Sequence, residues 1–208
     1  MSAADDALRE WSRRHGDYDL SRSRLVRGWV RSMHWFAAPL ARRRVSPHLV
    51  TAAGVLCAAA STVAPRRPAA ALVVTCAVLD GVDGAVAVQR GVAGAAGTVV
   101  DHGADRVTDV LFAVALHRAG ARRRTATAAA VGALGFEAAR DVARLSGHAR
   151  LDAVTVGERP MRVAAVAAGL LAAPTAGAVA VSVLTAAACV QFARGLSRPE
   201  GPPARVRR

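Results

Sequence analysis

Six apolar stretches, separated by short polar or Gly/Pro-rich segments, follow a charged N-terminal region. They cover residues 47–64, 69–89, 98–117, 125–145, 161–173 and 178–193. Apolar stretches of this length predict membrane-spanning helices, although Ala-rich spans are only weakly hydrophobic. We therefore expect an all-α integral membrane protein whose six transmembrane helices form one domain over residues 47–196.

The N-terminal arm, residues 1–46, combines basic and aromatic side chains. It holds ten arginines, interleaved with Trp11, Trp29, Trp35 and Phe36. Residues 21–44 predict an amphipathic helix on the membrane surface, with arginines at anionic headgroups and tryptophans at the interface. A nucleic-acid-binding arm is the alternative. It is disfavoured because the next residues enter a span, so nucleic acid is not an expected partner. Residues 197–208 are expected to be a basic, disordered tail.

The charge distribution predicts the orientation. The chain carries a formal net charge of +13 and is 53% hydrophobic. With six spans both termini share one side, and that side collects 20 of the 28 arginines, against six on the other side and two within spans. The positive-inside rule then places both termini in the cytoplasm, in a multi-pass protein of the plasma membrane whose active site faces the cytoplasm. The run Arg122–Arg124 opposes this orientation.

Five aspartates lie within the second and third spans. Asp80 and Asp83 are spaced i, i+3, and Asp101, Asp105 and Asp109 are spaced i, i+4, i+8, so each set shares one helix face. Acids at membrane depth usually face a polar cavity and mark a working site. Carboxylates aimed at one spot repel unless cations neutralise them, and such hard oxygen ligands suit Mg²⁺ or Mn²⁺.

Intramembrane acids also line ion pathways, so an ion-coupled transporter is a rival interpretation. The chain shows no inverted repeat, and a transporter has no need of the glycines and alanine at Gly84, Ala87 and Gly97 between its acids. The spacing Asp-x2-Asp-Gly-x2-Ala, then Gly-x3-Asp-x3-Asp, resembles the signature of the CDP-alcohol phosphatidyltransferase family. The matching positions are Asp80, Asp83, Gly84, Ala87, Gly97, Asp101 and Asp105.

Two further segments extend this resemblance. Residues 46–54 are similar to the family's opening of span one, and residues 157–162 resemble the Glu-Arg-x-x-Arg segment of the phosphatidylinositol phosphate synthases. The resemblance implies a homodimer with two divalent metals, CDP-diacylglycerol as donor, an alcohol acceptor and release of CMP. It implies that Asp80, Asp83 and Asp101 are metal ligands and that Asp105 is the general base with a metal contact. An inactive relative acting as a partner subunit is a further alternative.

The donor nucleotide is expected to contact residues around the motif: His48, Thr51, Gly84, Ala87 and Arg90. Gly81 and Gly84 lack side chains, so a nucleotide can approach the helix backbone closely. The sequence departs from the family pattern at three positions. Val88 stands where Arg is usual, His48 where Asn is frequent, and Gly94 where Ser or Thr is frequent. Arg90 is the candidate replacement for the missing guanidinium.

Three arginines could bind an acceptor phosphate, because a guanidinium matches phosphate geometry: Arg140, Arg159 and Arg162. They favour an acceptor such as inositol phosphate or glycerol phosphate. The alternative is that Arg159 and Arg162 only anchor span five at the membrane surface. Glu137 and Asp141 are expected to pair with Arg140 or Arg144 inside the bundle.

Overall fold

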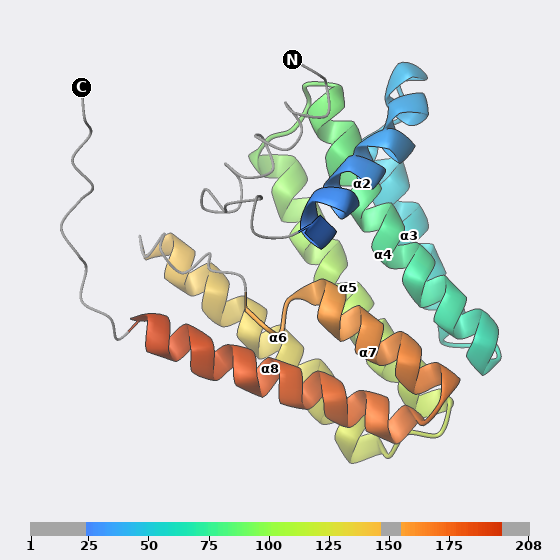
Figure 1. Cartoon of the computed structure of the whole chain (residues 1–208), viewed down its shortest axis with the longest axis vertical. Helices are drawn as coiled ribbons and strands as arrows, with labels where there is room; N and C mark the ends of the chain where they lie inside the picture. Colours follow the sequence, from blue (N-terminus) through green and yellow to red (C-terminus); the bar gives the residue numbers. More distant parts are fainter. Residues whose placement is uncertain (1–23, 147–154, 197–208) are drawn as a thin grey trace.

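The structure, a computed structural model, describes residues 24–146 and 155–196, and every regular element in these ranges is an α-helix (Figure 1). The seven helices of this part are α2 (Arg24–Arg42), α3 (Pro47–Ser61), α4 (Arg66–Gln89), α5 (Ala95–Arg118), α6 (Arg123–Leu145), α7 (Arg159–Leu171) and α8 (Pro174–Leu196). The all-α prediction is confirmed for this part of the chain. The start of the basic arm, most of the loop before α7 and the tail lie outside it.

Each of the six predicted spans coincides with one helix from α3 to α8. By length and composition, α4 and α8 are apolar enough to cross a membrane, and α3 is apolar but shorter. The six-span arrangement therefore stays a prediction. The helix predicted at 21–44 is present as α2, which contains Pro39. Its placement on a membrane surface also stays a prediction.

Glycine and backbone geometry explain where two helices end. Gly91 and Gly120 have φ values of 64° and 113° and follow the last residues of α4 and α5. In both places the next amide, Val92 or Ala121, donates back to a carbonyl five residues earlier. This is the Schellman pattern, in which a glycine in the left-handed region satisfies the orphan carbonyls of a helix end. The Gly-rich connection after α4 thus reverses the chain and brings α5 back along the bundle.

The hydrophobic core forms two clusters. The larger cluster contains residues of every helix from α3 through α8 and includes the fully buried side chains of Val73, Leu116 and Leu170. The smaller one joins α2 to the ends of α3 and α4 through Met33, Val50, Val82, Ala85 and Val86, among others. Figure 1 shows α2 crossing α4, and α8 running beside α6 and α7. The second cluster therefore fixes α2 against the half of α4 that carries the aspartates.

The crossing of α7 and α8 depends on two glycines. A Cβ added to Gly177 would lie 2.6 Å from Gly169 Cα and 3.0 Å from the Ala165 carbonyl oxygen. Both contacts are with backbone, which cannot rotate away. Close backbone contact of this kind maximises packing where two helices cross. This crossing holds the far end of α7, the helix that begins with Arg159.

We expect Gly177→Ala to destabilise the bundle by about 1–3 kcal/mol, because the methyl group forces α7 and α8 apart. Gly135→Ala is the matched control. An added Cβ there meets nothing within 4 Å, so the better helix propensity of alanine should leave stability unchanged or raise it. Thermal unfolding of both variants in detergent micelles measures the difference. Equal midpoints would contradict the role of this crossing.

Candidate active site

Three carboxylates from two helices converge at the centre of the candidate site. Asp80 comes from α4, and Asp101 and Asp105 come from one face of α5, as their i, i+4 spacing requires. One oxygen of each lies within 4.8 Å of the others. The convergence of the two aspartate sets, expected from sequence, is present for these three residues.

These residues fit a divalent cation. Asp101 Oδ1 is buried and has no hydrogen-bond partner among the described residues. A buried carboxylate oxygen without a donor is costly, and a cation would remove that cost. Three carboxylate oxygens also form the hard donor set that Mg²⁺ and Mn²⁺ prefer. Asp80, Asp101 and Asp105 could therefore hold such an ion.

Asp83 lies one helical turn beyond Asp80 but is engaged differently. Its side chain is 3% exposed, and its Oδ2 accepts a hydrogen bond of 2.5 Å from the Thr51 hydroxyl on α3. Asp83 and Thr51 nevertheless line the same small cavity as Asp80 and Asp105. Thr51 thus orients a carboxylate at the wall of the site. The roles predicted for these two residues stay predictions.

Arg159 places a guanidinium among the carboxylates. Its Nη1 forms ion pairs with Asp80 and with Asp105, and its Nη2 donates to the Thr108 hydroxyl at 2.7 Å. The side chain is 14% exposed. The contact with Asp105 Oδ1 lacks hydrogen-bond geometry, so that oxygen is paired in charge but has no directed donor. Arg159 and a bound cation would compete for the same oxygens.

Arg162 and Arg140, the other two candidate acceptor residues, belong to a separate buried network. Arg162 Nη2 lies 3.1 Å from Asp109 Oδ2 and 2.9 Å from Glu137 Oε1. Arg140 lies 3.3 Å from Glu158 and 3.9 Å from Glu137. Each guanidinium therefore already has two carboxylate partners. The structure brings only Arg159 to the three converging aspartates.

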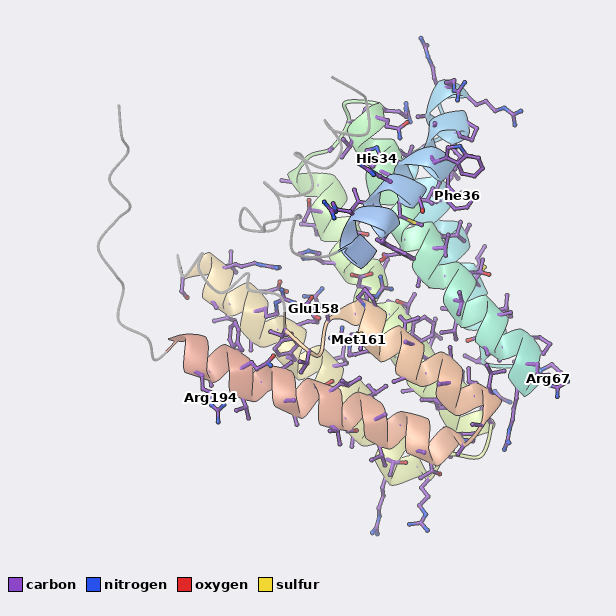
Figure 2. All side chains as sticks on the ribbon, in the orientation of Figure 1. His34, Phe36, Arg67, Glu158, Met161 and Arg194 are labelled. Carbon is purple, nitrogen blue, oxygen red and sulfur yellow. The ribbon has the colours of Figure 1, made fainter. Side chains whose placement is uncertain are left out.

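Glu158 connects this network to the loop before α7. It accepts hydrogen bonds of 3.0 Å from the backbone amide and the hydroxyl of Thr155, in addition to the contact with Arg140. Figure 2 shows Glu158 at the start of α7, close to α6. Because Arg159 is the next residue, these bonds set the position from which its side chain reaches the aspartates. Glu158 is the first residue of the Glu-Arg-x-x-Arg match, but its contact with Arg140 was not predicted. Thr108 was not singled out from the sequence, and its one signal is its place between Asp105 and Asp109.

Asp141 lies in a third group at the edge of the site. It forms ion pairs with Arg106 and, at 3.7 Å, with Arg144, and it lies 3.8 Å from His102. The predicted pairing of Glu137 and Asp141 with Arg140 and Arg144 is therefore confirmed. Arg106 follows Asp105 directly, so this half-exposed group borders the carboxylates.

The residues predicted to contact the nucleotide lie on α3, on α4 and at the C-cap of α4. His48 is exposed, and Gly84 is exposed with nothing within 4 Å of an added Cβ, so its backbone is open to a ligand. Ala87 is half-buried one turn further along α4. Arg90 donates to the Val45 carbonyl at 2.9 Å, which ties the end of α4 to the α2–α3 loop.

The prediction for Gly81 is wrong. A Cβ at this position would lie 2.8 Å from Met33 Sδ and 3.4 Å from a Trp29 ring carbon. The backbone of α4 at Gly81 is thus covered by α2 and is closed to a nucleotide. The missing side chain serves helix packing, which the spacing of glycines alone could not distinguish from ligand access.

Comparison with known proteins identifies the family of the chain and a similar fold. Residues 44–193 match the model of the CDP-alcohol phosphatidyltransferase family, and the chain belongs to that family of enzymes, as the aspartate motif predicted. The fold is similar to a crystal structure of phosphatidylinositol phosphate synthase from Mycobacterium tuberculosis with CDP-DAG bound. The TM-score is 0.64 at 22% identity, over 85% of this chain and 97% of that chain. None of the curated proteins compared with the chain matches it.

We expect Arg159→Gln to raise the affinity for Mn²⁺ by about tenfold or more, because the change removes a cation that contacts two of the three carboxylates. Electron paramagnetic resonance of free Mn²⁺ measures binding without turnover. Arg106→Gln is the matched control, since Arg106 pairs with Asp141 and not with the three aspartates. Unchanged Mn²⁺ affinity in Arg159→Gln would show that Arg159 does not compete for the metal oxygens.

Proposed function

We propose that this enzyme transfers a phosphatidyl group from CDP-diacylglycerol to an alcohol that already carries a phosphate, with release of CMP. Inositol phosphate and glycerol phosphate are the favoured acceptors. The observation that supports this proposal is the convergence of Asp80, Asp101 and Asp105 next to the guanidinium of Arg159. This arrangement offers acidic ligands for cations and a base, together with a positive group for an anionic substrate.

Two Mg²⁺ or Mn²⁺ ions, when bound, would neutralise the diphosphate and stabilise the leaving CMP. In this proposal Asp80, Asp83, Asp101 and Asp105 hold them. Asp105 also accepts the proton of the acceptor hydroxyl, whose oxygen forms the new bond to the phosphorus of the phosphatidyl group. The bond from that phosphorus to the oxygen of CMP breaks, and CMP leaves with the electron pair. In this proposal Arg159 leaves its ion pair with Asp105 for the acceptor phosphate, and the Asp105 carboxylate, which has no directed donor at Oδ1, then accepts this proton.

The donor nucleotide is proposed to lie along α3 and α4. Gly84 leaves the helix backbone open there, and Thr51, His48 and Ala87 lie on the same two helices. Arg90 is the weakest member of this set, because its guanidinium is bonded to the Val45 carbonyl. Its contribution would be to hold the α2–α3 loop beside the nucleotide.

The acceptor phosphate is proposed to interact with Arg159. Arg159 is the one arginine of the three candidates that touches the converging aspartates, and a guanidinium released from Asp80 and Asp105 could pair with a phosphate. Arg140 and Arg162 are proposed to position the helices around the site and not to contact the acceptor. Their ion pairs with Glu158, Glu137 and Asp109 hold α5, α6 and α7 together around the site.

The placement of the chain in the membrane is proposed from its charge distribution and from the two faces of α2. We propose six spans with both termini in the cytoplasm of a plasma-membrane protein, α2 on the surface among anionic lipids, and a homodimer as the working unit. In α2 the exposed Trp29, Trp35 and Phe36 contrast with the buried Val30 and Met33. Such a division suits a helix with one face on the protein and aromatic groups at the interface.

We expect Asp105→Asn to lower the rate of CMP release by at least about 10²–10⁴-fold, because it removes the proton acceptor and a metal ligand together. Release of CMP from CDP-diacylglycerol in mixed micelles with Mg²⁺ and an acceptor measures the rate. Asp141→Asn is the control, since Asp141 is an aspartate of the neighbouring ion-pair group and not of the converging three. A near-normal rate for Asp105→Asn across pH would exclude Asp105 as the base.

We expect Arg159→Ala to raise the KM for a phosphorylated acceptor by about tenfold or more, and the KM for CDP-diacylglycerol far less, because only the acceptor loses a charge-assisted contact. The steady-state assay should be run with inositol phosphate, glycerol phosphate and the uncharged inositol. Arg159→Lys keeps the charge and should recover part of the loss. Equal KM changes for both substrates, or equal activity with inositol, would refute the acceptor role.

A further inference from the structure

Six arginines gather at the end of the bundle remote from α2. They lie at the start of α4, at the end of α5 and at or just before the start of α6, and all are exposed: Arg66, Arg67, Arg118, Arg122, Arg123 and Arg124. Figure 2 shows Arg67 at this end of α4, whereas His34 and Phe36 lie on α2 near its other end. We call this surface the arginine end.

Hydrogen bonds make the arginine end one surface. Arg66 Nε and Nη2 both donate to the Ala119 carbonyl, at 3.0 and 2.5 Å, which joins the α3–α4 turn to the α5–α6 turn. The backbone amide of Arg122 donates to Thr175 Oγ1 at 3.3 Å and adds the start of α8. The arginines of two turns are therefore held beside each other by contacts that do not neutralise their charge.

No acidic residue balances this charge within the described ranges. The eight acidic residues there lie in the other half of the bundle or near its middle: Asp80, Asp83, Asp101, Asp105, Asp109, Glu137, Asp141 and Glu158. The first turns of α4 and α6 hold no acid. Apart from Arg66, none of the six guanidinium groups forms a hydrogen bond or ion pair with the residues described. The guanidinium groups of the arginine end are thus free of acidic partners among the described residues and open to an external anion.

Apolar side chains surround the same end. Val63 follows α3 and is 73% exposed, and Leu171 closes α7 and is 61% exposed. Arginines next to exposed aliphatic groups at helix ends match the boundary between acyl chains and phosphates, where long cationic side chains extend to the headgroups. Asp105 and Arg118 are 13 residues apart on α5, which corresponds to roughly 20 Å along the axis. The two ends therefore reach different depths of a bilayer.

We propose that the arginine end binds the phosphodiester headgroups of anionic phospholipids in the leaflet opposite the one that faces the aspartates. The inference rests on the membrane placement proposed above. Charge complementarity selects this partner, because a guanidinium pairs well with a phosphate and each basic residue adds about 1 kcal/mol near an anionic surface. The lipid supplies the negative charge that the protein lacks at this end.

Photo-crosslinking in nanodiscs tests this proposal on the full chain. The probes are photoactivatable phosphatidylglycerol and photoactivatable phosphatidylcholine, each at trace level in phosphatidylcholine. We expect phosphatidylglycerol to label the peptide covering residues 119–125 about fivefold more than phosphatidylcholine does. Equal labelling by the two probes would overturn the proposal, as would labelling by phosphatidylglycerol only on the N-terminal part. The proposal would also be overturned if an acidic soluble protein, added to the nanodiscs, abolished the labelling of residues 119–125 by phosphatidylglycerol.

Two variants of equal charge loss locate the effect. Arg67→Gln, Arg118→Gln and Arg123→Gln together should lower labelling by phosphatidylglycerol at residues 119–125 by about fivefold or more. The control combines Arg27→Gln, Arg31→Gln and Arg43→Gln in and after α2, and should leave that labelling unchanged. If the first variant fails to fold, the corresponding lysine variant must keep the preference, because it keeps the charge. Loss of the preference in the lysine variant would contradict a phosphate-binding role.

The readout separates this inference from the proposed reaction. Release of CMP should persist in the glutamine variant of the arginine end, because these residues lie far from the aspartates. Normal CMP release with no lipid preference would refute the lipid site alone. A clear lipid preference in a protein without CMP release would refute the proposed reaction and leave the lipid site supported.

Discussion

The arrangement of the site depends on one constraint: carboxylates held close together inside a helical bundle must be neutralised. Asp80 and Asp105 meet this constraint through Arg159, which comes from a third helix. The same solution recurs for Asp109 and Glu137 with Arg162. Because a buried carboxylate without a counter-charge is expensive, these ion pairs also decide where α7 can lie relative to α4, α5 and α6. The geometry of the candidate site and the packing of the helices therefore depend on the same residues.

Much of the fold could be predicted from the sequence, because apolar stretches and glycine-rich turns are local signals. The six helices α3–α8 follow the predicted spans, and the convergence of Asp80 with Asp101 and Asp105 follows from their spacing on two neighbouring helices. The family follows from the same motif. Helical spacing determines which residues share a face. Two helix faces that both carry carboxylates inside an apolar bundle are expected to face one shared polar site.

Contacts between distant segments could not be predicted in this way. The sequence around Gly81 does not predict that Met33, nearly fifty residues earlier, covers it. The sequence places Arg140, Arg159 and Arg162 in one neighbourhood, yet the structure gives Arg159 to the aspartates and the other two to Glu137. An arginine has several rotatable bonds and many possible acceptors. Its partner is decided by tertiary packing, which residue type and spacing do not encode.

The separation of charge along the helices also bears on how the chain reaches its final state. If the bundle spans a bilayer, the turns that carry Arg66, Arg67, Arg118 and Arg122–Arg124 must cross the hydrocarbon during insertion. Each arginine at the membrane centre costs about 2.5–3.5 kcal/mol on the insertion scale. For six arginines these costs sum to roughly 15–21 kcal/mol. Such a barrier makes translocation of these two hairpins the demanding step of biogenesis, and afterwards it locks the protein against inversion.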